Sequence, residues 1–495
     1  MKLWFLSDNA EWDTLRYRYA AEQMLFTLFP DERAEYPAAP PSDGEENAVV
    51  FTLRRAGDDA EMTALLVRGG ERYRGAVEFP AEGLDGSAEA VYHVIQRALK
   101  HAFYQAGVAH LGGDLPWGAL TGVRPVKLPT RALLSGATAE EAERELAERY
   151  HVSPLRRRLA MDCAAQSVNA LQSLAPDELS LYVGIPFCPS RCVYCSFVSA
   201  AVGQSLSLVE PFVDVLCREI DGAARLLART GKRVRTVYIG GGTPTTLSPA
   251  QLDRLLTTLR TALDLSRCTE FTVEAGRPDT ITPEKLAVLA QHGVGRVSVN
   301  PQSMDDAVLR RMGRPHTADD LRRAYAQTRA AAPFAVNMDL IAGLPGDSPD
   351  GFARSLREVL DMAPENITVH TLALKKGSRL MEFPEELPTD RAVEGMLDSA
   401  WAALRQAGYA PYYLYRQKYM SGSFENVGWA KPNTESLYNI IMMEELHSVL
   451  ALGGGVTKLL HPTTGKLTRY ANPKYPKEYI ERADTILKEK ESLSL

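Results

Sequence analysis

The stretch LYVGIPFCPSRCVYC, residues 181–195, decides the fold of this chain. Within it, Cys188, Cys192 and Cys195 form a C-x3-C-x2-C triplet directly after an apolar segment rich in β-forming residues. Iron–sulfur clusters are held by cysteine thiolates, usually four, so three thiolates in one short loop leave one iron of a cubane cluster without a protein ligand. The triplet therefore predicts a cluster whose open iron can bind a substrate or a cofactor.

A zinc site or a chance grouping is the alternative interpretation of the triplet. Structural zinc sites prefer paired C-x2-C units with a second pair elsewhere, and the sequence contains no second pair. The other three cysteines, Cys163, Cys217 and Cys268, stand alone. Isolated cysteines mostly behave as small buried hydrophobic residues, and free thiols suit a reducing compartment. We expect core positions for these three.

The composition is that of a globular protein with ordinary charge. Of 495 residues, 45% are apolar and 24% are charged, which excludes wholesale disorder. The net charge of −6 argues against a nucleic-acid partner. The N-terminal residues turn acidic at Asp8 before a signal-peptide core could form, and no apolar run approaches the ~18 residues of a membrane span. We therefore predict a cytoplasmic protein without a transmembrane segment.

The length exceeds that of a typical single domain and predicts more than one. Short alternating runs between residues 48 and 80 predict a small antiparallel sheet, and helical periodicity follows, with Thr138 as a capping start for one helix. We interpret residues 1–170 as an N-terminal accessory α+β domain. Residues 171–380 form the predicted barrel, and residues 381–495 form a C-terminal extension.

After residue 176 the pattern changes to strands that alternate with longer amphipathic helices. Regular β-α alternation predicts a parallel sheet with right-handed helical crossovers. Six such units fit an incomplete barrel, so the predicted fold class is α/β with a partial (β/α)6 barrel. The six strands are expected near residues 181–186, 235–239, 270–274, 296–300, 335–341 and 366–370.

Special residues follow the predicted strands at their carboxyl ends, where barrels of this type build their active sites. The cysteine triplet follows the first strand, and a Gly-Gly-Gly-Thr run, residues 240–243, follows the second. Residues without Cβ let backbone groups approach a bound ligand closely, although a glycine-rich strand exit alone is more often only a tight turn. At the later strand ends the corresponding residues are Glu274, Gln302, Ser303, Asp339 and Ala373.

The spacing of the triplet, with Tyr194 before the last cysteine, resembles the cluster loop of radical S-adenosylmethionine (SAM) enzymes. Within that superfamily, Tyr182 and the run Ile-Pro-Phe-Cys ending at Cys188 resemble the oxygen-independent coproporphyrinogen III oxidase group. The similarity covers residues 179–458 and is closest to the branch of oxygen-independent coproporphyrinogen dehydrogenases with a long N-terminal extension. It implies a [4Fe-4S] cluster on the three cysteines and a bound SAM.

The resemblance also implies which residues contact SAM. Arg314, in Met-Gly-Arg-Pro-His-Thr, matches the arginine that neutralises the methionine carboxylate, for which a fixed guanidinium fork is suited. Gln302 and Asp339 match the residues that hold the adenosine hydroxyls, and Tyr194 would pack on the adenine. The other implied SAM contacts are Tyr182, Gly241, Gly242, Thr243, Glu274 and Ala373.

The activity that the resemblance implies is a radical oxidative decarboxylation. A low-potential donor, flavodoxin or ferredoxin, would reduce the cluster, and cleavage of SAM would give a deoxyadenosyl radical. In the oxidase group this radical abstracts hydrogen from a propionate of coproporphyrinogen III, a tetrapyrrole, and loss of carbon dioxide then leaves a vinyl group. Such chemistry needs walls that exclude water, which a barrel interior provides.

Two positions depart from the best-characterised oxidases, and two other functions stay open. This chain has Phe197 where those oxidases carry a fourth cysteine, and Gly184 where they carry a histidine. Haem-binding trafficking proteins on the same scaffold also lack the fourth cysteine but carry a His-Asn-x-x-Tyr-Trp segment, and here residues 425–429 stand in its place without the histidine. A radical SAM methylase that acts on another substrate is the second alternative.

Two C-terminal regions allow more than one interpretation. Residues 412–418 and 424–429 combine aromatic side chains with cations, a mixture that suits a tetrapyrrole bearing carboxylates. An ordinary aromatic packing segment explains them equally well. Residues 452–456, Leu-Gly-Gly-Gly-Val, predict a close-approach turn without a catalytic role.

Overall fold

The computed structural model describes residues 1–7, 14–42, 44–195, 200–374, 378–382, 387–417 and 424–495. The chain forms two compact units. The first is built mainly from Met1–Met161, and the second from Asp162–Ser421 and Glu425–Leu495. The predicted domain boundaries at 170/171 and 380/381 stay a prediction.

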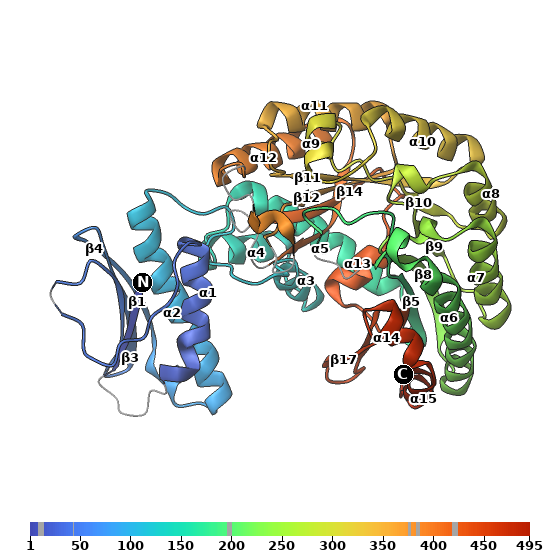
Figure 1. The fold of residues 1–495 in the computed structure, drawn as a ribbon. Helices are drawn as coiled ribbons and strands as arrows, with labels where there is room; N and C mark the ends of the chain where they lie inside the picture. Colours follow the sequence, from blue (N-terminus) through green and yellow to red (C-terminus); the bar gives the residue numbers. More distant parts are fainter. Residues whose placement is uncertain (8–13, 43, 196–199, 375–377, 383–386, 418–423) are drawn as a thin grey trace. The chain divides into compact units, whose positions relative to one another are not determined.

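The first unit is a four-stranded sheet covered by two helices (Figure 1). Its elements are β1 (Lys2–Ser7), β2 (Asn47–Ala56), β3 (Asp59–Arg68), β4 (Glu71–Pro80), α1 (Arg18–Leu28) and α2 (Ala88–Leu111). The strands lie in the order β1-β2-β3-β4, with β1 parallel to β2 and the other two pairings antiparallel. Val49, Phe51 and Leu66 pack with Leu99 and Phe103 in one buried core. The antiparallel sheet predicted between residues 48 and 80 is confirmed, and β1 adds a parallel strand to it.

The predicted capping start at Thr138 is also confirmed. The next helices along the chain are α3 (Lys127–Leu134), α4 (Ala139–Arg144) and α5 (Pro154–Ser173). Before α4, Thr138 Oγ1 accepts a hydrogen bond from Glu141 N at 3.2 Å, and the Glu141 carboxylate accepts one from Thr138 N at 2.8 Å. This reciprocal pair satisfies two backbone donors that have no partner inside the helix.

The second unit is built on one eleven-stranded sheet. Its strands are β5 (Glu178–Ile185), β8 (Arg233–Gly241), β9 (Glu270–Glu274), β10 (Arg296–Ser298), β11 (Ala335–Ala342), β12 (Asn366–Thr371), β13 (Ala410–Arg416), β14 (Glu425–Ala430), β15 (Val449–Gly453), β16 (Val456–Leu460) and β17 (Leu467–Ala471). They lie in the order β13-β14-β12-β11-β10-β9-β8-β5-β15-β16-β17. From β15 to β12 all neighbours are parallel, and these strands include all six that the sequence predicts. The α/β partial barrel is confirmed.

β15 is a further parallel strand that the sequence-based prediction missed. It lies beside β5, with Leu450 opposite Leu181 and Gly453 opposite Gly184. The turn after β15 approaches β5 so closely that a Cβ on Gly184 would lie 2.8 Å from the carbonyl carbon of Gly454. Position 184, where the best-characterised oxidases carry a histidine, therefore has no room for a side chain in this protein.

Amphipathic helices cover the outer side of the parallel strands (Figure 1). They are α6 (Val202–Thr230), α7 (Pro249–Ala262), α8 (Pro283–Gln291), α9 (Asp306–Arg311), α10 (Ala318–Ala331), α11 (Pro349–Met362) and α12 (Asp390–Gln406). Local sequence fixes their starts: Ser248 forms a capping box with Gln251 before α7, and Ser348 caps α11 with Pro349 in the first turn. Because the starts are fixed, the loops that lead from each strand into its helix stay at the carboxyl ends of the strands.

α13 (Leu437–Glu444) is fixed to the opposite end of the strands. The carboxylate of Glu270, the first residue of β9, accepts hydrogen bonds from Ser436 Oγ at 2.8 Å, Leu437 N at 2.8 Å and Tyr438 N at 3.2 Å. A carboxylate at a helix N-terminus satisfies donors that lack intrahelical partners and favours the helix dipole. The Tyr438 ring then stacks on Tyr238 of β8, with centroids 4.4 Å apart.

A buried ion pair ties the last helices, α14 (Pro476–Glu481) and α15 (Ala483–Glu491), to the end of β15. Lys490 Nζ lies 2.8 Å from Glu219 Oε1, and their side chains are 4% and 0% exposed. Glu219 also accepts hydrogen bonds from Gly453 N at 2.7 Å and Tyr479 Oη at 2.6 Å. Buried charges persist only when they are paired and hydrogen-bonded, as these are.

Two expectations from composition can be compared with the structure. Cys163 is fully buried, and burial raises the pKa of its thiol. Cys217 and Cys268 are only half-buried, so the expected core position holds fully for Cys163 alone. Within the described parts of the chain, no helix combines the length and the apolar character needed to cross a membrane.

Candidate active site

Cys188, Cys192 and Cys195 lie in the loop that follows β5. Cys188 ends the short strand β6 (Phe187–Cys188), which pairs with β7 (Ala200–Ala201). Cys192 is 8% exposed, and Cys188 and Cys195 are half-buried. No three His, Cys, Asp or Glu side chains of the described residues form a ready group of metal ligands. The assignment of these cysteines as cluster ligands stays a prediction, and Phe197 lies outside the described residues.

Hydrogen bonds from neighbouring loops hold the cysteine loop in place. Val193 N donates to Met312 O at 3.0 Å, and Arg379 N donates to Val193 O at 2.9 Å. Thr243 Oγ1 donates to Cys188 Sγ at 3.6 Å, so the end of the glycine run contacts a predicted cluster ligand. The loop thus has a fixed backbone and a polar neighbour for at least one sulfur atom.

The glycine run after β8 packs against the backbone of the cysteine strand. Gly242 N donates to Ile185 O at 2.8 Å. The φ of Gly241 is +112°, a backbone conformation that residues other than glycine rarely adopt. A Cβ on Gly242 would lie 2.4 Å from Phe187 O. Here the glycines are required by close approach, so the backbone itself forms the wall of the site beside Cys188.

Glu274, at the end of β9, is a half-buried carboxylate without a cation. Its Oε1 accepts from Tyr238 Oη at 2.6 Å, and its Oε2 accepts from Gly241 N at 3.2 Å. Desolvation, together with the nearby Asp339, raises the pKa of Glu274 to about 7, although the hydrogen bonds from Tyr238 and Gly241 N act to lower it. No cation among the described residues pairs with it. Such a carboxyl group can accept a hydrogen bond from the ammonium group of a ligand.

Arg314 is a buried cation without a carboxylate partner among the described residues. It is 5% exposed, and its Nε donates to Tyr194 Oη at 3.2 Å while its Nη1 donates to Asn300 O at 2.8 Å. Burial alone would lower the pKa of Arg314, but Tyr194 and Cys192 raise it, so the guanidinium stays charged. The structure thereby brings the predicted carboxylate-binding arginine onto the cysteine loop.

Gln302 and Asp339 are joined through their backbones. Gln302 N donates to Asp339 O at 2.8 Å, and Ile341 N donates to Gln302 O at 3.0 Å. Asp339 Oδ1 accepts from Asn337 Nδ2 at 2.8 Å, and its Oδ2 lies 3.7 Å from His370 Nε2. Burial would raise the pKa of Asp339, but the contacts with His370 and Asn337 outweigh it and leave the pKa lowered. An ionised carboxylate is suited to accept hydrogen bonds from hydroxyl groups.

Tyr182 takes part in a stack of three tyrosines inside the barrel. Its ring centroid lies 6.3 Å from that of Tyr238 and 6.5 Å from that of Tyr438. Tyr182 and Tyr238 are paired in register on β5 and β8, which explains why they meet. Ala373, the last predicted contact, lies half-buried just beyond β12. The ligand roles predicted for Tyr182 and Ala373 stay predictions.

The residues at this end of the barrel fit the charges of an amino acid. A cation that lacks a carboxylate, Arg314, and a carboxylate that lacks a cation, Glu274, are both desolvated, and such groups are costly unless a ligand completes them. Three hydroxyl groups on the neighbouring elements β9, β10 and α13, Thr272 Oγ1, Ser298 Oγ and Tyr438 Oη, are buried without a hydrogen-bond partner among the described residues. The site therefore fits the methionine part of SAM.

The aromatic C-terminal segment, which had two open interpretations, is mainly a packing segment where it is described. Tyr412 and Tyr413 are 1% and 5% exposed and belong to a core cluster with Ile440. Tyr413 also packs on Gly428, where a Cβ would clash with its ring at 1.9 Å. Lys418 lies outside the described residues. These two tyrosines hold β13 against β14 and have no surface left for a tetrapyrrole.

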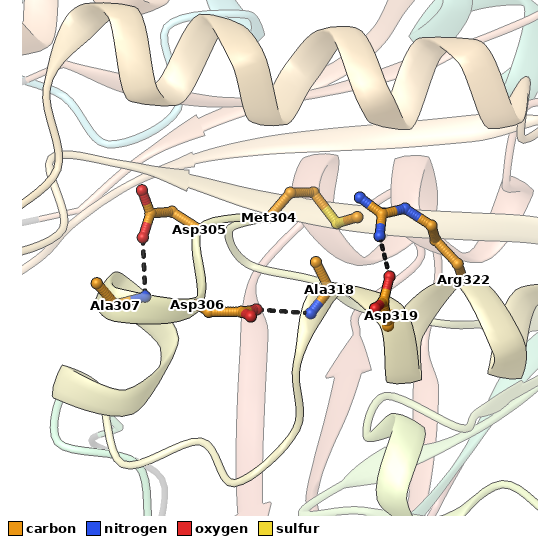
Figure 2. Close-up of a pocket in the computed structure, with 7 residues that line it drawn as sticks. All are labelled: Met304, Asp305, Asp306, Ala307, Ala318, Asp319 and Arg322. Carbon is orange, nitrogen blue, oxygen red and sulfur yellow. Dashed lines mark hydrogen bonds and ion pairs between the residues drawn. The ribbon is translucent and has the colours of Figure 1, made fainter.

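A cavity of about 370 Å³ is lined by the loop before α9, by α9 and by the first turns of α10 (Figure 2). Its carboxylates already serve the local fold. Asp305 Oδ1 accepts from Ala307 N at 2.8 Å, Asp306 Oδ1 accepts from Ala318 N at 2.8 Å, and Asp319 pairs with Arg322. We therefore assign no ligand to this cavity.

Sequence reasoning missed three residues of the site. His370 faces Asp339, Asn300 Oδ1 accepts from Asp339 N at 3.2 Å, and Arg277 contacts Cys192. For His370 the alternation of strand side chains was an available signal, because Thr368 and His370 share a face of β12. For Arg277 the only sequence signal was its place three residues after Glu274.

Comparisons with known proteins agree with this geometry. Residues 182–359 match the Radical SAM superfamily. The chain is 38% identical over 412 residues to the "oxygen-independent coproporphyrinogen-III oxidase-like protein HemZ" of Bacillus subtilis, covering 82% of each protein. It is 27% identical to "heme chaperone HemW" of Escherichia coli, covering 61% of this chain and 76% of that protein. Among solved structures, coproporphyrinogen III oxidase (HemN) of E. coli has a TM-score of 0.52 at 24% identity, over 65% of this chain and 72% of that one.

Proposed function

This chain belongs to the radical SAM superfamily and, within it, to the oxygen-independent coproporphyrinogen oxidase-like proteins, and from that premise we propose that it converts propionate side chains of coproporphyrinogen III to vinyl groups without oxygen. The observation that supports a SAM-dependent reaction most directly is that Arg314 and Glu274, at the predicted SAM-binding positions, each lack a partner of opposite charge among the described residues. Members of the superfamily use a [4Fe-4S] cluster and SAM.

The residues of the site would divide the binding of SAM between them. When bound, the cluster and SAM supply the one-electron chemistry that breaks an unactivated C–H bond. Arg314 would bind the methionine carboxylate, and Glu274 would accept a hydrogen bond from the amino group. Asp339 and Gln302 would hold the adenosine hydroxyls. The contribution of these side chains is to bind and orient the cofactor in a site that excludes water.

The backbone contributes the wall nearest to the cysteines. Because the glycine run, residues 240–242, has no side chains, it packs directly on the cysteine strand, where Gly242 N donates to Ile185 O. Thr243 Oγ1, at the end of the run, donates to Cys188 Sγ. Tyr194 joins the two parts of the site, since it belongs to the cysteine loop and accepts a hydrogen bond from Arg314. We propose that Cys188, Cys192 and Cys195 hold the cluster in this frame.

A haem-trafficking function is the alternative that relatives named heme chaperone raise. The segment that would carry the haem-binding histidine is β14 (Glu425–Ala430), in which every residue is buried. Asn426 Oδ1 accepts from Thr371 N at 2.9 Å, so even the polar residue of this strand serves the sheet. The strand contains no imidazole, thiol or thioether side chain. This favours the enzyme over a haem carrier that uses this segment.

Anaerobic turnover of the reconstituted protein tests the proposal. The protein is incubated with SAM, dithionite and coproporphyrinogen III, and deoxyadenosine and the vinyl product are quantified separately. Formation of both products is expected. Deoxyadenosine without the vinyl product would contradict the decarboxylation and favour a methylase or another substrate. Absence of deoxyadenosine would contradict the enzyme altogether.

Two cysteine variants provide a matched control. Cys192→Ala is expected to lose the cluster and all SAM cleavage, because a cluster iron then lacks its thiolate. Cys217→Ala removes a thiol on α6, away from the cysteine loop, whose Sγ accepts from Thr258 Oγ1 at 3.5 Å, and it should leave both intact. Iron and sulfide analysis measures the outcome. A full cluster in Cys192→Ala would disprove the ligand assignment.

The cellular setting completes the proposal. We propose flavodoxin or ferredoxin as the electron donor and the cytoplasm as the location. The isolated thiols of Cys163, Cys217 and Cys268 suit a reducing compartment, which supports the location. Reduction of the cluster by purified flavodoxin in place of dithionite would test the donor.

A further inference from the structure

Arg277 connects the end of β9 with the cysteine loop. It is 3% exposed, and its three nitrogen atoms make five hydrogen bonds, one for each N–H group of the side chain. Nη1 donates to Cys192 Sγ at 3.7 Å and to Ser190 O at 3.4 Å, and Nη2 donates to Ser190 Oγ at 3.1 Å. Toward the other side, Nε donates to Asp279 Oδ1 at 3.0 Å and Nη2 to Asp279 Oδ2 at 3.2 Å.

The backbone around Arg277 is rigid. The residue precedes the single helical turn Pro278–Thr280, and Thr280 Oγ1 donates to Arg277 O at 2.8 Å. Thr280 Oγ1 also lies 2.6 Å from Thr245 Oγ1, which belongs to the loop after β8. The turn thus fixes the backbone of Arg277, and its guanidinium is held on two sides, by Asp279 of that turn and by the cysteine loop.

The position of this cation has an electrostatic consequence for a cluster on Cys192. Hydrogen bonds to cluster sulfur atoms and nearby positive charge make the reduced, more negative state easier to reach. The effect is large where water is excluded, because the local dielectric is low. Asp279, 28% exposed, balances part of the charge of Arg277 and keeps its fork pointed at the loop.

We propose that Arg277 is a positioning residue that holds Ser190 and Cys192 of the cluster loop and raises the reduction potential of the bound cluster. The proposal rests on the proposed function only in requiring a cluster on Cys192. It does not depend on the substrate. Asp279 sets the size of the effect, since it neutralises the guanidinium on the side away from the sulfur.

Potentiometric titration of the reconstituted cluster, followed by electron paramagnetic resonance of the reduced state, tests this role. Arg277→Gln keeps a hydrogen-bond donor but removes the charge. At a fixed potential, its ratio of reduced to oxidised cluster should fall about tenfold, which is about 59 mV for a one-electron couple. Arg277→Lys should recover part of the wild-type potential, because lysine keeps the positive charge but lacks the forked hydrogen-bond geometry of the guanidinium.

A second variant and a control keep the test decisive if Arg277→Gln fails to hold the cluster. Asp279→Asn leaves Arg277 in place and removes its counter-charge, so the potential should rise. Arg329→Gln removes an arginine that pairs with Glu365 on the far end of the sheet, and the potential should stay as in the wild type. The role of Arg277 would be disproved by an unchanged potential in Arg277→Gln, or by an unchanged or lower one in Asp279→Asn. No substrate is used, so failure of the decarboxylation would not affect the result.

Discussion

Acidic residues at the two ends of the parallel strands differ in how many partners their carboxylates have within the protein. At the amino ends, the Glu365 carboxylate accepts from Arg329 Nη2 at 2.8 and 3.0 Å and from Val336 N at 2.7 Å, and Glu270 caps α13. At the carboxyl ends, the Glu274 carboxylate accepts hydrogen bonds from the Tyr238 hydroxyl and from Gly241 N, and no cation of the described residues pairs with it. In barrels of this kind the carboxyl ends carry function and the amino ends stability. Acidic residues that stabilise the sheet have all their partners within the protein, whereas Glu274 can still accept a hydrogen bond from a ligand.

Replacement of Arg314 should give the largest difference between the two ends. Arg314→Gln removes the buried cation that we propose binds the methionine carboxylate, and SAM binding should weaken at least about 100-fold, or about 2.7 kcal/mol. Arg329→Gln at the amino end should leave SAM affinity unchanged and lower stability. Calorimetric titration of both reconstituted variants with SAM measures this. An equal loss of SAM affinity in the two variants would contradict the proposed difference between the two ends of the strands.

Replacement of Glu270 should show the reverse pattern. Glu270→Ala leaves three donors at the start of α13 without an acceptor, and we expect a loss of about 2 kcal/mol of stability. SAM affinity of the folded protein should not change. Glu358→Ala, which breaks an exposed pair with Arg322, is the control and should cost under about 1 kcal/mol. Thermal unfolding of the three proteins compares them, and a SAM defect in Glu270→Ala would contradict a purely stabilising role.

The pH dependence of stability should reveal Glu274, with the smallest effect of the three. Its pKa is raised to about 7 in the folded protein from about 4.5. The folded state therefore binds more protons than the unfolded state between these values, so its contribution is fully present below pH 4.5 and is lost as pH rises through 7. Discounted for partial exposure, we expect about 1 kcal/mol.

A variant isolates this contribution. Glu274→Gln cannot titrate, so the difference in unfolding free energy between wild type and variant should fall from pH 5 to pH 8. Urea unfolding without SAM at several pH values measures it. A difference that stays constant, or that rises with pH, would show that the carboxyl group is not held protonated by its surroundings.

Sequence reasoning succeeded where the signal is local. The cysteine triplet, the glycine run and Glu274 each mark a strand end through their immediate neighbours, and six strands were predicted from alternation alone. The structure then brings Thr243 to Cys188 and Arg314 to Tyr194. Their ligand roles stay predictions.

The features that were missed depend on partners far away in the chain. β15 is only five residues long and becomes a central strand because β5, more than 250 residues earlier, lies beside it. Arg277 became recognisable only through its contacts with Ser190 and Cys192, which lie 87 and 85 residues before it in the sequence. The sequence could not decide whether Tyr412 and Tyr413 lie at the surface or in the core, because the neighbouring strand and helix determine the burial of an aromatic side chain.

The buried pair of Glu219 and Lys490 bears on the order of events during synthesis. β5 carries the cysteine loop, yet one of its two neighbouring strands is β15, and the end of β15 is fixed by Glu219, whose cation is Lys490. A nascent chain that has just exposed Cys195 still lacks that strand and that lysine. We therefore expect the cluster loop to reach its final form, ready to receive iron and sulfide, only after residue 490 has been translated.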